Sequence, residues 1–302
     1  MKSGIMTYCL KNALPESGRN IESLIRAAGE EGYSLELYYP DLEPGNEDPR
    51  KAAESAKKLA DESKVKFFGL GMGARIGHVN PELAAQNMKE LKLNLEVAEI
   101  LGAEVVTFAA IDSQPVPPDR PEEQFGMMFD DTLSYMVEQM QEVAQDAAQR
   151  GLNTALLNHC FHIYLGIHQH WISLLTDKPN AGACVDPGNY LYYTYGSEDP
   201  GRETKICASS AKMFRAGDWT VAPDDEILER YRSMPKGRGR VFNCSGAILG
   251  EGAVDHAACF KVLADAGYDG YVSLKVAGTS EAGPMDAIKT SMKNLSDMLA
   301  SA

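Results

Sequence analysis

Short apolar runs and longer stretches of helical periodicity alternate along the chain. Eight of the short runs are rich in aliphatic, β-branched and aromatic residues, which predicts strands. Several of them, such as Glu104–Ala109, are apolar nearly throughout, which is typical of strands that are covered on both faces. The predicted strands are Gly4–Cys9, Ser34–Tyr39, Lys66–Leu70, Glu104–Ala109, Thr154–Asn158, Ala181–Asp186, Ile206–Lys212 and Tyr271–Lys275.

Segments with apolar residues three and four positions apart lie between these runs and predict helices. Glycines at positions 32, 102, 151 and 267 stand just after the last periodic residue, where a helix commonly ends. The predicted helices are Ile21–Glu31, Ala52–Ser63, Pro81–Leu101, Thr132–Arg150, His170–Leu175, Asp255–Ala266 and Met285–Leu299.

The alternation predicts one α/β domain over residues 1–302, folded as a (β/α)₈ TIM barrel. Eight strand-and-helix units of about 35 to 40 residues fill the chain, as such a barrel requires. A doubly wound parallel sheet is the alternative. Two long segments, Gln114–Phe129 and Phe214–Gly252, follow strand ends. In a barrel they would overhang the carboxyl-terminal face, where catalytic sites lie.

Charge and composition limit the possible binding partners and the cellular location of the protein. The chain has 29 Lys and Arg against 43 Asp and Glu, a net charge of −14, which repels nucleic acid and anionic lipid. No run approaches the ~18 apolar residues of a membrane helix, and we predict no export signal. The six cysteines are scattered without a C-x-x-C pair, which favours reduced thiols. We therefore expect a cytoplasmic protein whose partner is a small molecule.

Two local motifs are weak. The G-x-G-x-G sequence at residues 69–73 follows a predicted strand, but its spacing differs from that of a dinucleotide site and no helix starts directly after it. Four histidines lie within residues 159–170, yet their spacing does not place them on one side of a strand or helix. Only His159 is of interest, because the strand Thr154–Asn158 delivers it to the mouth of the barrel.

The ends of the later predicted strands carry a more specific set of motifs, over nearly the whole chain. With them the sequence resembles the xylose isomerase-like sugar phosphate isomerase/epimerase family of TIM barrels. The motifs are Leu101-Gly102-Ala103, Asn158-His159, Asp186-Pro187-Gly188-Asn189, Ala211-Lys212, Gly250-Glu251-Gly252 and the segment Gly267–Leu274.

The resemblance implies a divalent metal site at the mouth of the barrel. In that family a Glu before Asn-His, an Asp before Pro-Gly-Asn, a His two residues before the lysine of Ala-Lys and a Glu ending the eighth strand hold the metal. In this sequence only Asp186 matches. The other three positions carry Leu157, Ser210 and Lys275. We therefore expect no metal and no other cofactor, because one carboxylate beside an ammonium does not hold a hard divalent cation.

The replacements predict lysine chemistry instead. Small or apolar residues at positions 157, 210 and 277 would leave a cavity with Lys275 at its floor. Desolvation there would lower the pKa of Lys275 toward neutrality and make its amine nucleophilic toward carbonyls.

We therefore hypothesise an engineered or diverged Schiff-base aldolase or retro-aldolase acting on a small carbonyl compound, preferably apolar and aromatic. The predicted catalytic residues are Lys275, Asp186 and His159, with either of the last two as base. The predicted substrate-binding residues are Leu157, Asn158, Ser210, Lys212 and Ala277.

Three alternatives stay open at this point. Lys275 could merely neutralise Asp186 in a salt bridge. The chain could retain metal-dependent sugar or sugar phosphate isomerase or epimerase activity. It could also be a non-catalytic relative of that family that binds a ligand without turnover.

Overall fold

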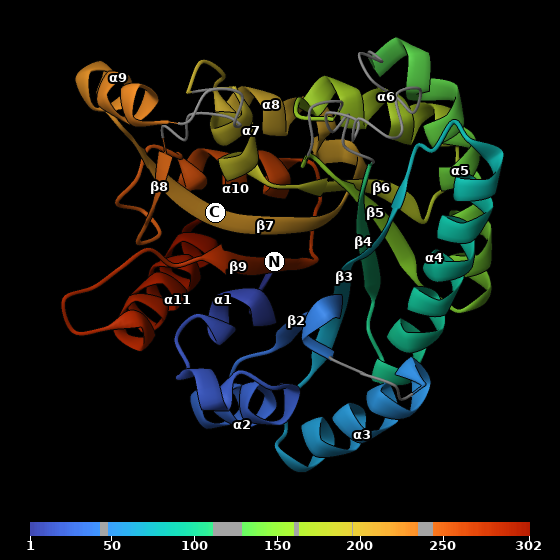
Figure 1. Cartoon of the computed structure of the whole chain (residues 1–302), viewed down its shortest axis with the longest axis horizontal. Coiled ribbons are helices and arrows are strands. Elements are labelled where there is room, and N and C mark those ends of the chain that lie inside the picture. The colour runs from blue at the N-terminus through green and yellow to red at the C-terminus, as the bar shows by residue number, and fades with distance from the viewer. Residues whose placement is uncertain (43–47, 111–128, 160–162, 195, 235–243) are drawn as a thin grey trace.

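Parallel strands close into a barrel at the centre of the molecule (Figure 1). The computed structural model describes the chain except residues 43–47, 111–128, 160–162, 195 and 235–243. Within the described ranges the barrel has eight strands, and β9 pairs with β1 to close it. In order around the barrel they are β1 (Lys2–Met6), β2 (Leu35–Tyr38), β3 (Phe67–Ile76), β4 (Val105–Ala110), β5 (Asn153–Leu157), β6 (Ala181–Val185), β7 (Ala211–Val221) and β9 (Tyr271–Val276).

Helices surround the barrel, which confirms the predicted (β/α)₈ fold. Two of them, α2 (Ile21–Glu31) and α4 (Pro81–Leu101), coincide with their predicted ranges, and asparagine side chains cap both amino ends. Other helices around the barrel are α3 (Pro49–Glu62), α5 (Phe129–Gln149), α6 (Gly166–Thr176), α8 (Pro200–Cys207), α10 (His256–Asp265) and α11 (Pro284–Ser301). Helices also follow the ends of strands β1, β6 and β7: α1 (Thr7–Lys11), α7 (Pro187–Tyr193) and α9 (Asp224–Ser233).

The predicted seventh strand, Ile206–Lys212, is wrong. Its first residues end α8, a short 3-10 helix follows at Ala208–Ser210, and β7 only begins at Ala211. The helix has a clear start signal, since the Asp199 carboxylate accepts the N–H groups of Gly201 and Arg202. A short apolar run cannot be assigned to strand or helix by periodicity alone, and here the cap decides.

The inside of the barrel is filled by its own small core. The rings of Phe68 and Tyr271 stack at 4.2 Å between centroids and close the amino-terminal end. A Cβ at Gly4 would lie 2.3 Å from the Phe68 ring, so this position on β1 needs glycine. Val105, Ala155, Leu157, Cys184 and Met213 complete this cluster. The larger core lies between the strands and the surrounding helices.

Asp218 organises the chain beyond the seventh barrel strand. Here β7 continues into an antiparallel pair with β8 (Cys244–Ala247). The buried Asp218 carboxylate accepts the N–H groups of Gly250, Gly252 and Val254. A Cβ at Gly252 would lie 2.2 Å from an Asp218 oxygen, so the Gly250-Glu251-Gly252 motif is required by this close approach. None of the helices in the described ranges has the length and apolar composition needed to cross a membrane.

Acid should destabilise the fold through His256, which is buried beside Asp218 with 4.0 Å between Nδ1 and Oδ2. Burial lowers the pKa of His256 below 6.5, despite the opposing attraction of Asp218. Below about pH 6.5 the unfolded chain therefore binds the proton more readily, and the free energy of unfolding falls by up to about 1.4 kcal/mol per pH unit.

Urea denaturation across pH 5 to 8, a range chosen around the pKa of histidine, measures this effect. The His256→Gln variant should show a weaker loss of stability on acidification than the unmodified protein. His170→Gln, on the half-exposed part of α6, is the control and should keep the original pH dependence. Equal slopes for His256→Gln and the unmodified chain would refute the assignment.

Candidate active site

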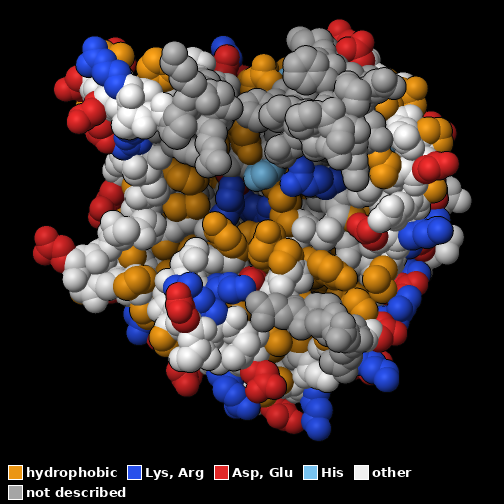
Figure 2. All heavy atoms as spheres, viewed as in Figure 1, with side chains coloured by type: hydrophobic (Ala, Val, Ile, Leu, Met, Phe, Trp, Pro, Cys, Tyr) orange, Lys and Arg blue, Asp and Glu red, His pale blue; other side chains and the backbone are white. Residues whose placement is uncertain are grey.

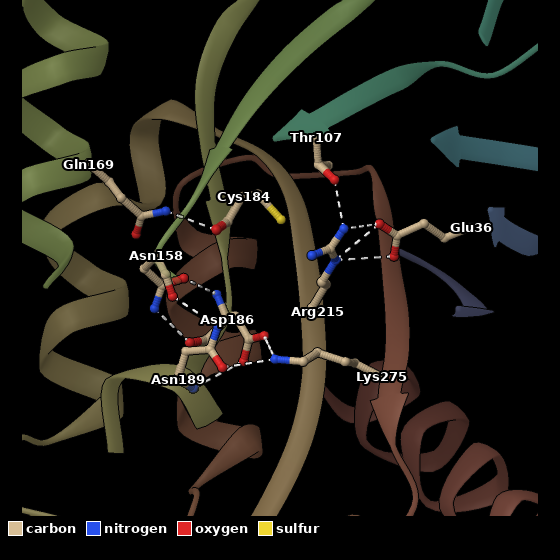
Figure 3. Close-up of polar contacts among 9 residues, drawn as sticks. All are labelled: Glu36, Thr107, Asn158, Gln169, Cys184, Asp186, Asn189, Arg215 and Lys275. Atoms are coloured by element: carbon tan, nitrogen blue, oxygen red, sulfur yellow. Dashed lines mark hydrogen bonds and ion pairs between the residues drawn. The ribbon is translucent and has the colours of Figure 1, made fainter. Parts of the chain in front are cut away.

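Lys275 and Asp186 form an ion pair at the carboxyl-terminal end of the barrel (Figure 3). Lys275 Nζ lies 2.6 Å from Asp186 Oδ2 and also donates to Asn189 Oδ1 at 2.8 Å. The Asp186 side chain is fully buried, whereas that of Lys275 keeps 16% exposure. The salt bridge that the sequence left open is therefore formed, and of its two side chains only that of Lys275 keeps contact with solvent.

The backbone around Asp186 is fixed by amide side chains. Asn158 Nδ2 donates to the carbonyl of Asp186 at 2.8 Å, and Asn158 Oδ1 accepts the N–H of Asp186 at 3.0 Å. Asp186 Oδ1 accepts the N–H of Asn189 and thereby caps α7. Asn158, which we predicted to bind substrate, is fully buried and instead ties the end of β5 to the end of β6.

A second buried ion pair lies beside the first and was missed by sequence reasoning. Arg215 Nε on β7 donates to Glu36 Oε1 on β2 at 3.0 Å, and Arg215 Nη2 contacts the same carboxylate and Thr107 Oγ1. Burial alone would lower the pKa of Arg215, but the Glu36 carboxylate raises it beyond its ordinary value. A Cβ at Gly71 would lie 2.4 Å from Arg215 Nη2. The middle glycine of the G-x-G-x-G sequence, Gly71, is thus required by the close approach of the Arg215 guanidinium and not by a nucleotide.

Part of the signal for this pair was present in the sequence. Glu36 stands between two leucines of β2, and Arg215 stands between Phe214 and Ala216 on β7. Cys184 also points into the barrel from β6 (Figure 3). Burial raises the pKa of Cys184 to about 12, so its thiol stays protonated and is a poor nucleophile.

The cavity predicted from positions 157, 210 and 277 does not form. Ser210 precedes β7 and donates to the carbonyl of Cys207, and Lys212 lines a hollow at the opposite, amino-terminal end. Leu157 is packed into the core inside the barrel, while Ala277 lies against the outer core. The cavity was predicted wrongly because the seventh strand was misplaced. Ser210 and Lys212 lie at the start of the actual strand β7, not at its carboxyl-terminal end.

Lys275 instead borders a different pocket, between the end of β9, α1 and the start of α11. The pocket holds about 290 Å³, and Tyr8, Trp219 and Ala277 also line it. Figure 2 shows basic side chains in a hollow near the middle of one face of the molecule, with hydrophobic side chains around them. The candidate base His159 follows β5, and its ring meets that of Tyr193 edge-on at 5.8 Å. Its part in a reaction stays a prediction.

Strand register corrects the expected metal ligands. Val185 pairs with Phe214, so Arg215 is the β7 residue beside Asp186, and it takes the place that we gave to Ser210. The four residues to compare with the ligand pattern of the family are then Leu157, Asp186, Arg215 and Lys275. Two cations and one carboxylate that is already paired do not suit a divalent metal. In the described part of the chain, no group of three or more His, Cys, Asp or Glu side chains could hold one.

Comparison with known proteins agrees with the fold. A family model described as xylose isomerase-like TIM barrel matches residues 23–298. The chain belongs to the xylose isomerase-like TIM barrel family. No curated protein matches it significantly.

Solved structures are similar over nearly the whole chain. The IOLI protein with a bound zinc atom has a TM-score of 0.72 and 14% identity, over 100% of this chain and 99% of that one. The 3-keto-D-glucoside 4-epimerase YcjR from E. coli has a TM-score of 0.69 and 16% identity, over 98% and 99%. A D-psicose 3-epimerase has a TM-score of 0.68 and 13% identity, over 99% and 97%. At these identities the likeness shows the fold alone.

Restoring the ligands at the positions given by the register should create a metal site. We expect the Leu157→Glu, Arg215→His and Lys275→Glu substitutions, combined with Glu36→Gln, to bind one divalent cation in calorimetric titration with Mn²⁺. The Glu36→Gln change is needed because removal of Arg215 would leave a buried carboxylate without a partner.

The matched control keeps Leu157→Glu and Lys275→Glu but carries Ser210→His in place of Arg215→His and Glu36→Gln. It should bind no metal. Circular dichroism confirms that both variants are folded. Binding by the control, or by neither folded variant, would show that the register does not identify the ligand positions.

Proposed function

We propose that the protein is a lysine-dependent enzyme that forms a Schiff base with a small carbonyl compound and makes or breaks a carbon–carbon bond. The observation that carries this proposal is the amine–carboxylate pair of Lys275 and Asp186 at the carboxyl-terminal end of the barrel, together with the pocket that Lys275 lines there. This is the end at which TIM-barrel enzymes hold their active sites.

The first half of the reaction needs only the two members of the pair. Asp186 accepts a proton from the Lys275 ammonium, and the neutral amine attacks the carbonyl carbon. One proton moves from the attacking nitrogen to the oxygen to give the carbinolamine, and Asp186 returns its own proton to this hydroxyl group, which leaves as water. The result is an iminium on Lys275 and a carboxylate on Asp186, so that the charges of the resting pair are kept.

Bond cleavage uses the same carboxylate. Asp186 takes the proton of the β-hydroxyl group, the carbon–carbon bond breaks, and its electron pair moves into the iminium to give an enamine and an aldehyde. Asp186 then protonates the enamine carbon. Hydrolysis of the new iminium releases the ketone and restores the ammonium and carboxylate.

Metal-dependent epimerisation has less support in this chain. Some solved neighbours are described as epimerases, and the IOLI structure has a bound zinc atom. Here, however, the four compared positions carry Leu157, Arg215 and Lys275 beside Asp186, and this donor set does not fit a metal. A barrel that binds a ligand without turnover is the second candidate, because Asp186 and Asn189 both hold the amine in place.

Reduction with borohydride in the presence of the aldol of benzaldehyde and acetone tests the proposal. We expect one covalent adduct, located on Lys275 by peptide mass spectrometry, together with release of benzaldehyde. The Lys275→Met variant should lose both adduct and turnover.

Lys212→Met is the matched control, because Lys212 lies at the amino-terminal end of the barrel and its loss should leave the adduct unchanged. An adduct that persists in Lys275→Met would refute the mechanism. Binding of the ketone with neither adduct nor turnover would instead establish the second candidate.

A further inference from the structure

The pocket beside Lys275 is bordered by aromatic rings. Trp219 and Tyr8 line it together with Lys275, and Ala277 and Ile288 add apolar surface. Behind Trp219 the rings of Tyr192, Tyr193 and His159 follow one another, with centroids 5.4, 5.2 and 5.8 Å apart. Trp219 is therefore the first ring of a supported aromatic row and not an isolated side chain.

The charges of this pocket disfavour an anionic ligand. Among the described residues that line it, Lys275 is the only one with a charged side chain, and it is already paired with Asp186. A phosphate group would have to compete with Asp186 for that ammonium, in a chain of net charge −14. The polar side chains Asn12 and Thr279 are exposed at the rim, so few groups could replace the water around several sugar hydroxyls.

We infer that the preferred substrate is a neutral ketone or aldehyde with an apolar, ring-sized body. Its carbonyl would meet Lys275, and its body would pack on Trp219 and Tyr8. The pocket of about 290 Å³ holds a compact ligand of this kind. This inference rests on the proposed function, since it names the substrate class of the same site.

Binding of an unreactive probe separates recognition from chemistry. The probe is the alcohol obtained by reducing benzylacetone, which has a phenyl ring but no carbonyl and cannot form a Schiff base. We expect calorimetry to show binding to the unmodified protein, about tenfold weaker for Trp219→Ala and for Tyr8→Ala. Trp171→Ala removes an exposed tryptophan on α6 and should bind like the unmodified protein.

Fructose phosphate and free fructose are the competing ligands, and both should bind more weakly than the alcohol. Tighter binding of either sugar, or unchanged affinity in both Trp219→Ala and Tyr8→Ala, would overturn the inference even if borohydride labels Lys275. Conversely, the expected pattern of affinities without any borohydride adduct would support the apolar site and refute the Schiff-base function.

Discussion

Pairing of opposite charges inside the barrel is the constraint on which the described site depends. Arg215 faces Glu36 and Lys275 faces Asp186, with little or no contact with solvent. A buried charge is tolerated only when a partner and hydrogen bonds replace its water, and loss of one partner typically costs about 3 to 5 kcal/mol. The guanidinium also explains why residue 71 has no side chain, and the carboxylate of Asp186 explains the amides around it.

The same pairing changes what the family fold can do in this chain. A divalent cation needs several oxygen or nitrogen donors that are free to coordinate it. Here the barrel interior already contains two positive groups, Arg215 and Lys275, and they engage the carboxylates of Glu36 and Asp186. Membership of the xylose isomerase-like family therefore establishes the barrel, while the side chains at its mouth determine the chemistry.

Sequence patterns predicted the barrel well because strands covered on both faces are apolar throughout. They failed at Ile206–Lys212, where an apolar run belongs to a capped helix, and this single shift moved Ser210 and Lys212 to the wrong end. Asp186 and Lys275 were found because they stand at strand ends. The pairing of Glu36 with Arg215 joins residues 179 positions apart, and neither strand alone shows that its charge is turned inward.

The geometry of the Lys275–Asp186 pair also bears on which electrophile could react with the lysine amine. Both groups that hold the amine, the Asp186 carboxylate and the Asn189 amide oxygen, are acceptors that bind its hydrogens. An anionic ligand would compete with Asp186 for the ammonium and would leave that carboxylate buried without a partner. A neutral carbonyl makes no such demand, because proton transfer from Lys275 to Asp186 removes both charges at once and releases the lone pair for attack. In the proposed reaction, the ion pair of the resting barrel would therefore favour uncharged carbonyl compounds before any contact with the rest of the substrate is made.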